Sequence, residues 1–184
     1  MNYWLIKTEP TAYSIDDLKW DKKTSWTGIR NYQARNFIRD GVKAGDKCLF
    51  YHSGTEPIVI YGVAKVISNP YPDPTQFDKK EKRVTDNFLL KISATPPRAD
   101  ALRPLIAPSI RNQAKSTKDR SQWFVFDVSF EKKFDKAITL AQIKFDPILK
   151  NMIVAKKGSR LSILPVSEEH FKLILDQVKK LKLN

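Results

Sequence analysis

The sequence predicts a mixed α/β domain built around a small, strongly curved sheet or barrel. Roughly six stretches have the bulky, β-prone composition of strands, and short helices and turns separate them. A parallel doubly wound fold is disfavoured, because it needs regular alternation of strand and helix and a glycine-rich phosphate loop after a strand. The basic turn at residues 156–159 lacks the glycine spacing of such a loop.

The first quarter of the chain carries one strand signal and two helix signals. Residues 3–7 are bulky and β-prone, which predicts a first strand. Ser14, followed closely by two acidic residues, predicts the N-cap of a short helix. Residues 32–39 have helical spacing, and Gly41 predicts the end of that helix. Residues 21–25 are expected to form a polar connection.

Two further strands follow the second helix. Residues 48–52 are too apolar to be exposed on a full face of a sheet, and we expect Cys48 to be a buried strand residue rather than a nucleophile. Residues 58–67 predict a strand that is bulged at Gly62. Residues 69–74 contain three prolines, so we expect a loop there instead of regular structure.

The C-terminal part of the chain resumes a clear pattern. Residues 122–130 alternate between two apolar sides and predict a central strand. A short helix is predicted at 139–145, and a last strand is expected within 161–166. The final helix has its N-cap at Ser167 and repeats apolar residues at helical spacing.

Length and composition bound the class of protein. At 184 residues the chain suits one domain with a sizeable core, so we expect a single domain over residues 1–184. The sequence contains no run of eighteen apolar residues and no secretory-signal pattern, which predicts a soluble protein of the cytoplasm, or of the nucleus in a eukaryote. A single cysteine and two histidines predict neither a disulfide nor a zinc cluster.

The net charge is the strongest bulk signal. The chain has 33 basic and 20 acidic residues, a formal charge of +13. A folded basic domain with interleaved aromatic residues favours nucleic acid over membrane as its partner. Eleven basic and four acidic residues lie between Lys79 and Arg120, where we also expect a strand at 88–92 and a helix at 104–114. Five of these basic residues are candidate phosphate contacts: Lys80, Lys82, Arg83, Arg111 and Lys115.

Residues 25–39 gather three arginines, two asparagines and several aromatic rings around one short helix. Trp26 stands two residues before Gly28, a residue that lets the backbone approach a ligand closely. This pattern is typical of a ligand-contacting loop that leads into a helix. A tryptophan packed in the core is the competing interpretation of Trp26.

Four blocks of the sequence, residues 2–10, 26–37, 50–53 and 157–162, together resemble the EVE domain family. The resemblance implies a PUA-like fold, a curved β-barrel flanked by helices, related to the YTH modules that read methylated adenine in RNA. Family members are regarded as binders of modified bases that use no cofactor. The connection between residues 71–73 and Trp123 is longer than in typical members, which predicts a basic insertion at about 79–118.

A pocket for a single base needs stacking surfaces for its faces and hydrogen bonds for its edge. The resemblance favours Trp26 as a stacking wall, and Trp123 is either a second wall or part of the core. The other residues expected at the nucleobase pocket are Thr27, Gly28, Lys7, Thr8, Glu9, Tyr51, His52 and Ser53. The residues expected to contact phosphates are Arg30, Arg35, Arg160 and Ser162.

The Trp26 loop, the positive charge and the resemblance to the EVE domain family together imply a non-enzymatic module, monomeric and without metal or cofactor, that holds a modified base of DNA or RNA in an aromatic pocket with a basic rim. One alternative is an enzyme that acts on a base or nucleotide through Glu9 or an aspartate. The sequence lacks a recognisable nucleophile–base pair, metal cluster and phosphate loop, which disfavours that alternative. A second alternative is an adaptor whose basic insertion contacts a protein.

Overall fold

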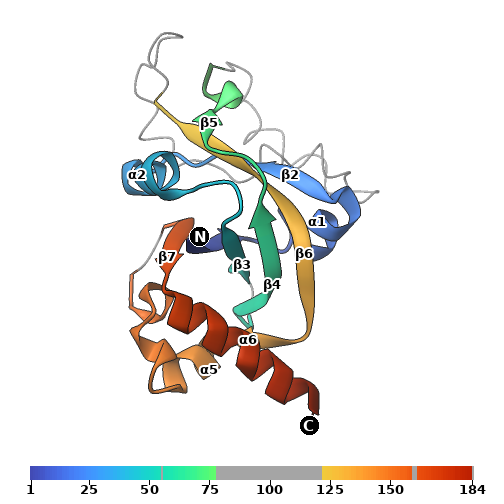
Figure 1. The fold of residues 1–184 in the computed structure, drawn as a ribbon. Coiled ribbons are helices and arrows are strands. Elements are labelled where there is room, and N and C mark those ends of the chain that lie inside the picture. Colours follow the sequence, from blue (N-terminus) through green and yellow to red (C-terminus); the bar gives the residue numbers. More distant parts are fainter. Residues whose placement is uncertain (55, 78–121, 159–160, 184) are drawn as a thin grey trace.

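A computed structural model of the chain describes residues 1–54, 56–77, 122–158 and 161–183 (Figure 1). The strand predicted at 88–92, the helix predicted at 104–114 and the basic insertion expected at about 79–118 lie outside these residues.

The described strands form one curved, mixed sheet of seven strands in the order β2-β6-β4-β3-β1-β7, with β5 paired to β6 beside this path (Figure 1). The strands are β1 (Tyr3–Thr8), β2 (Lys23–Trp26), β3 (Lys47–His52), β4 (Val59–Val66), β5 (Tyr71–Pro72), β6 (Phe124–Thr139) and β7 (Ile163–Val166). The β1–β3 pair is parallel and the other pairs are antiparallel. The predicted mixed α/β class is confirmed, but over the described residues the sheet is open between β2 and β7 and is not a closed barrel.

The helices begin where the sequence places their caps. The helices and short 3-10 turns are α1 (Ile15–Asp21), α2 (Tyr32–Gly41), η1 (Pro74–Phe77), α5 (Leu140–Phe145), η6 (Leu149–Asn151), η7 (Ile153–Ala155) and α6 (Glu168–Leu183). Ser14 and Thr139 each form a capping box, and the Asn31 side chain accepts from the backbone N–H groups of Gln33 and Ala34. The predicted helices at 14–18, 32–39, 139–145 and after Ser167 are confirmed.

The sheet has a hydrophobic core on each face. One face, which we call the inner core, carries Trp4 and Ile6 and is covered by helices α1 and α2. The other face, the outer core, carries Leu5 and is covered by α5 and α6 (Figure 1). This division follows from strand geometry, because successive side chains point to opposite faces. Cys48 lies fully buried in the inner core, as predicted, and burial raises the pKa of its thiol well above the usual range.

The sheet curls around the inner core. Trp26 on β2 and Phe50 on β3 are separated by β6 and β4 in the sheet, which in a flat sheet would put them about 14 Å apart. Their ring centroids are 5.6 Å apart instead, with the rings edge to face. Irregular register between β4 and β6 on both sides of Gly62 accompanies this curvature and confirms the predicted bulge.

Three expectations about local structure were wrong. Residues 21–25 were expected to be a connection, but Lys23–Trp26 form β2 against β6. The proline-rich segment 69–74 was expected to lack regular structure, but Tyr71 and Pro72 form β5 and a 3-10 turn follows. The central strand extends to Thr139, nine residues beyond its predicted end at 130. In each case the partner strand supplies hydrogen bonds that local composition does not reveal.

Candidate nucleic-acid interface

The ends of β1 and β3 lie side by side, as the predicted site requires. Lys7 is paired with Tyr51 and Thr8 with His52 in parallel register. The Ser53 N–H donates to the Thr8 carbonyl at 2.9 Å, and the Lys7 N–H donates to the Ser162 carbonyl at 2.8 Å. The structure therefore brings these segments, which are distant in sequence, to one end of the sheet.

Strand alternation nevertheless divides their side chains between the two faces. Tyr51 belongs to the outer core, and the Lys7 ammonium lies 5.7 Å from its ring centroid. His52 lies on the inner side, 5.5 Å from the Phe50 ring. Burial lowers the pKa of Lys7 and raises the pKa of Tyr51 to about 12. One base cannot contact both pairs of side chains, which corrects the expectation that they line a single pocket.

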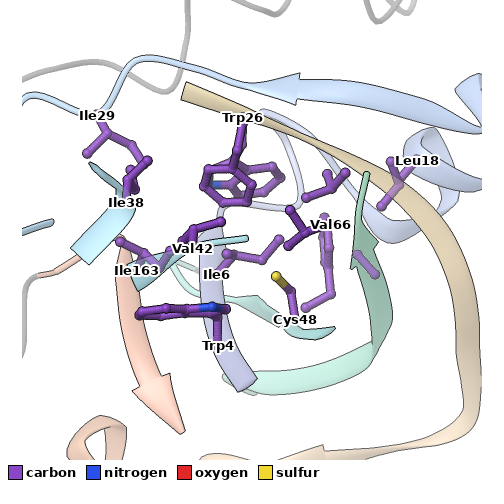
Figure 2. Packing of buried hydrophobic residues seen from close by; sticks show 14 of the residues in the cluster. Trp4, Ile6, Leu18, Trp26, Ile29, Ile38, Val42, Cys48, Val66 and Ile163 are labelled. Atoms are coloured by element: carbon purple, nitrogen blue, oxygen red, sulfur yellow. The ribbon is translucent and has the colours of Figure 1, made fainter. Parts of the chain in front are cut away.

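Trp26 lies in the inner core and is 1% exposed. Figure 2 shows its indole beneath β2 and β6, among Ile29, Val42 and Ile6. Thr27 and Gly28 are also buried, and Gly28 has a φ of 77°, a conformation that favours glycine. In this structure neither face of the Trp26 ring is open to a base.

Two inner-core side chains carry polar atoms without partners. The indole Nε1 of Trp26 and both ring nitrogens of His52 are buried and make no hydrogen bond within the part of the chain that the structure describes. His52 is 4% exposed, and its ring lies against Phe50 and, at 4.7 Å, against Tyr61. Both residues contact the Phe50 ring, so we call them the Trp26–His52 pair. Leaving a buried donor or acceptor unpaired costs about 1–3 kcal/mol, so this arrangement needs a reason.

The charge state of His52 makes a test of this burial possible. Burial lowers the pKa of His52 to about 4, whereas the unfolded chain titrates near 6.5. The unfolded state therefore binds the proton more tightly than the folded state does. The contribution of neutral His52 to the free energy of unfolding is complete above about pH 6.5, and up to about 3 kcal/mol of it is lost as the pH falls towards 4.

We expect His52→Phe to flatten the pH dependence of stability between pH 6.5 and 4, as measured by urea unfolding. His170→Gln, which replaces the other histidine of the chain, is the matched control and should keep the wild-type slope. Parallel profiles for His52→Phe and the wild type would contradict the burial of a neutral imidazole.

Arg30 does not face phosphate, which corrects its predicted role. Its side chain is 3% exposed and forms an ion pair with Asp73, whose side chain is fully buried. A second guanidinium nitrogen donates to the Thr75 hydroxyl at 2.9 Å. The Asp73 carboxylate also accepts from the Thr75 N–H at 2.8 Å. The pair therefore fixes the segment after β5 against the start of α2.

Trp123 also lies in the interior, at 2% exposure. Its ring centroid is 5.2 Å from that of Tyr32 and 5.8 Å from the Arg30 guanidinium carbon. The Arg35 guanidinium lies 5.0 Å from the Tyr32 ring centroid. The sequence analysis includes Tyr32 only as the start of the helix predicted at 32–39, although an aromatic residue three positions before an arginine on a helix is a recognisable contact signal.

The remaining predicted residues contribute less to a site. Glu9 is exposed, and its side chain lies next to Gly54, where an added Cβ would be 2.9 Å from the Glu9 side chain. Ser162 offers its backbone carbonyl to Lys7, whereas Arg160 and the five basic candidates between 80 and 115 lie outside the described residues. Within the described ranges, side chains form no metal-binding cluster, and none of the helices is long and apolar enough to cross a membrane.

Comparison with known proteins decides the family. The model of the EVE domain matches residues 2–107 and 103–177. The chain belongs to the EVE domain family. Thymocyte nuclear protein 1 of Homo sapiens is 33% identical over 198 residues, which cover 97% of this chain and 75% of that protein. Its counterpart in Gallus gallus is 33% identical over 192 residues, covering 94% of this chain and 67% of that protein.

Solved structures resemble this EVE domain over nearly its full length. A hypothetical protein from Leishmania major matches with a TM-score of 0.77 at 33% identity, covering 99% of this chain and 97% of that one. Human THYN1 protein in complex with DNA containing 5-methylcytosine matches with a TM-score of 0.71 at 32% identity, covering 97% and 98% of the two chains. The relatives' name is that of a nuclear protein, and the cytoplasmic location expected from the sequence gains no support from it.

Proposed function

We propose that this EVE domain is a non-enzymatic DNA-binding module that takes a modified base, with 5-methylcytosine as the first candidate, into the inner core beside the Trp26–His52 pair. The observation that carries the proposal is that three buried polar atoms on these two side chains have no hydrogen-bond partner among the described residues. Both side chains belong to segments that the family resemblance assigns to a nucleobase pocket.

The chemistry of the pair suits an extruded base. A base taken out of its stack loses both neighbours and its hydrogen-bonded partner, so a reader must supply flat apolar surfaces and edge contacts. The Trp26 indole is a donor, and a neutral His52 imidazole offers one donor and one acceptor. Phe50 and Tyr61 supply aromatic surface next to His52. Binding requires the inner core to open beside Phe50.

Charge supplies the affinity that the pocket alone would lack. With a net charge of +13, the chain attracts phosphates and gains free energy by releasing counterions, so binding should weaken steeply with salt. The related human protein was crystallised with DNA containing 5-methylcytosine, which favours DNA over RNA as the first ligand to test.

The test is a titration of matched oligonucleotides with cytosine or 5-methylcytosine, as single strands, duplexes and RNA. We expect tighter binding of the modified DNA by the wild type. Trp26→Phe keeps an aromatic ring but removes the indole donor, and should lower this preference about fivefold, the value of one hydrogen bond. Trp20→Phe changes an exposed tryptophan and is the matched control.

Equal affinity for modified and unmodified ligands, in DNA and in RNA, would refute the proposal. A preference that survives both Trp26→Phe and His52→Phe in folded protein would place the base elsewhere. The enzyme alternative requires turnover of a modified nucleotide that Glu9→Gln abolishes. Glu9 is exposed, and His52 has no carboxylate partner among the described residues, so the geometry favours binding over catalysis.

A further inference from the structure

Four planar side chains contact one another in series at the start of α2, and we call this set the ladder. In order of contact, these side chains are Arg30, Trp123, Tyr32 and Arg35. The three successive separations are 5.8, 5.2 and 5.0 Å. The inner two members are buried, whereas Tyr32 is 41% exposed and Arg35 is half-buried. The ladder therefore starts inside the protein and reaches the surface at Tyr32 and Arg35.

Polar contacts hold the ladder in place along its length. The buried ion pair with Asp73 anchors Arg30. The Gln122 amide donates to the Tyr32 hydroxyl at 2.6 Å. The Asn36 side-chain oxygen accepts from Nε and Nη2 of Arg35 at 3.1 and 2.7 Å. Because these groups are already ordered, a ligand that stacks on the exposed end loses little free energy to side-chain ordering.

The helix that carries the exposed end is joined to the proposed base site by a short loop and by shared packing. Tyr32 is the first residue of α2 and follows Trp26 in the same loop, six positions later. Ile38 on α2 and Ile29 in the loop pack in the same inner core as Trp26 (Figure 2). A strand whose modified base enters beside Trp26 would therefore pass near this end of α2.

We propose that Tyr32 and Arg35 form a stacking platform for the nucleobase next to the one that is read, an inference that rests on the proposed function. An aromatic ring carrying a guanidinium stacks on a base of any sequence. Two donors of Arg35 are engaged by Asn36, which favours use of its flat face over a bidentate grip on phosphate. The competing interpretation is a Tyr–Arg pair that only stabilises the surface of α2.

A mutant cycle with single-stranded DNA tests the platform. The ligands carry 5-methylcytosine with either a normal base or an abasic site beside it, on the 5′ or the 3′ side. The first variant is Arg35→Lys, which keeps the charge but removes the planar group. The second is Tyr32→Leu, and Arg39→Lys, an exposed arginine on the same helix, is the matched control.

For the wild type, we expect the abasic site on one side to weaken binding roughly tenfold. Arg35→Lys should weaken binding of the intact strand to a similar extent and make the abasic site nearly neutral. Losses that multiply independently would overturn the platform. So would an Arg35→Gln variant that lowers the salt dependence while Arg35→Lys binds normally, because that result assigns Arg35 to phosphate.

The outcome for the platform can be separated from that for the proposed function. Discrimination between 5-methylcytosine and cytosine reports on the Trp26–His52 pair, whereas coupling between Arg35 and the neighbouring base reports on the ladder. If coupling persists in strands that contain only unmodified bases and modification has no effect, the platform stands and the modified-base proposal fails.

Discussion

Asp73→Asn is expected to destabilise the fold by about 3–5 kcal/mol, because it leaves the buried Arg30 guanidinium without a charged partner. The Arg30 and Asp73 side chains are 3% and 0% exposed, so solvent cannot replace the lost interaction. For a chain of this length the change corresponds to a fall of roughly 10 °C in Tm. Thermal unfolding followed by circular dichroism measures it.

The exposed Arg39–Asp40 pair provides a matched control for this prediction. It joins the same residue types at 2.6 Å, but its side chains are 44% and 60% exposed. Exposed pairs contribute little to stability, so Asp40→Asn should leave Tm unchanged within error. A similar small effect at both sites would show that the Arg30–Asp73 pair is hydrated in solution.

A double variant separates the cost of an unpaired charge from the value of the ion pair. Replacing both residues together, as Arg30→Met with Asp73→Leu, removes the charges at once and should cost less than the two single substitutions combined. The same double variant should weaken the platform, because it removes the contact between the Arg30 guanidinium and the Trp123 ring.

Much of the fold could be predicted because its signals are local. The N-caps at Ser14 and Asn31 each start a helix where the side-chain oxygen meets free backbone N–H groups. The alternation in residues 122–130 places Phe126 and Val128 in the inner core, as one face of a strand should. The glycine in the middle of a strand marks the bulge at position 62.

The candidate site was harder to predict because it depends on contacts that are distant in sequence. Arg30 and Asp73 are 43 residues apart, and nothing in the composition of either segment indicates that they pair. An arginine near a tryptophan and a glycine has the same sequence signature whether it points to solvent or to a buried carboxylate. The burial of Trp26 likewise depends on how far the sheet curls over Phe50.

The division of Lys7, Thr8, Tyr51 and His52 between two faces could have been predicted. Adjacent residues on a strand point to opposite sides of the sheet. Leu5 and Leu49 pack in the outer core, so Lys7 and Tyr51, each two residues further along, share that side. Sequence reasoning treated each strand end as one cluster and so combined two separate surfaces.

The curvature of the sheet, and with it the proposed site, depends on the absence of a side chain at Gly62. A Cβ at this position would lie 2.2 Å from the Lys132 carbonyl oxygen and 3.2 Å from the Lys132 carbonyl carbon. Both atoms belong to the backbone of β6, so no side chain can turn aside to make room. Strands β4 and β6 would have to move apart at the centre of the sheet.

We therefore expect Gly62→Ala to destabilise the fold by more than about 2 kcal/mol. The sign of this change in the free energy of unfolding is informative, because alanine in an ordinary strand interior is about 0.5–1 kcal/mol more favourable than glycine. Gly45→Ala is the comparison, since a Cβ there meets no atom within 4 Å and only the φ of 98° opposes the change. Its cost should be smaller, about 1–2 kcal/mol.

Urea unfolding measures both variants, and binding of 5-methylcytosine DNA at a temperature where both are folded measures the effect on function. Gly62→Ala should also weaken binding, because β6 carries Phe126, which pairs with Trp26 in the register of the sheet, and β4 pairs with β3, which carries Phe50 and His52. A shift between β4 and β6 therefore changes the separation of the Trp26–His52 pair.

If Gly62→Ala were stabilising, β4 and β6 would not approach each other as closely in solution as they do in this structure. If it were destabilising without any effect on binding, the inner core beside Phe50 would not be the site that holds the base.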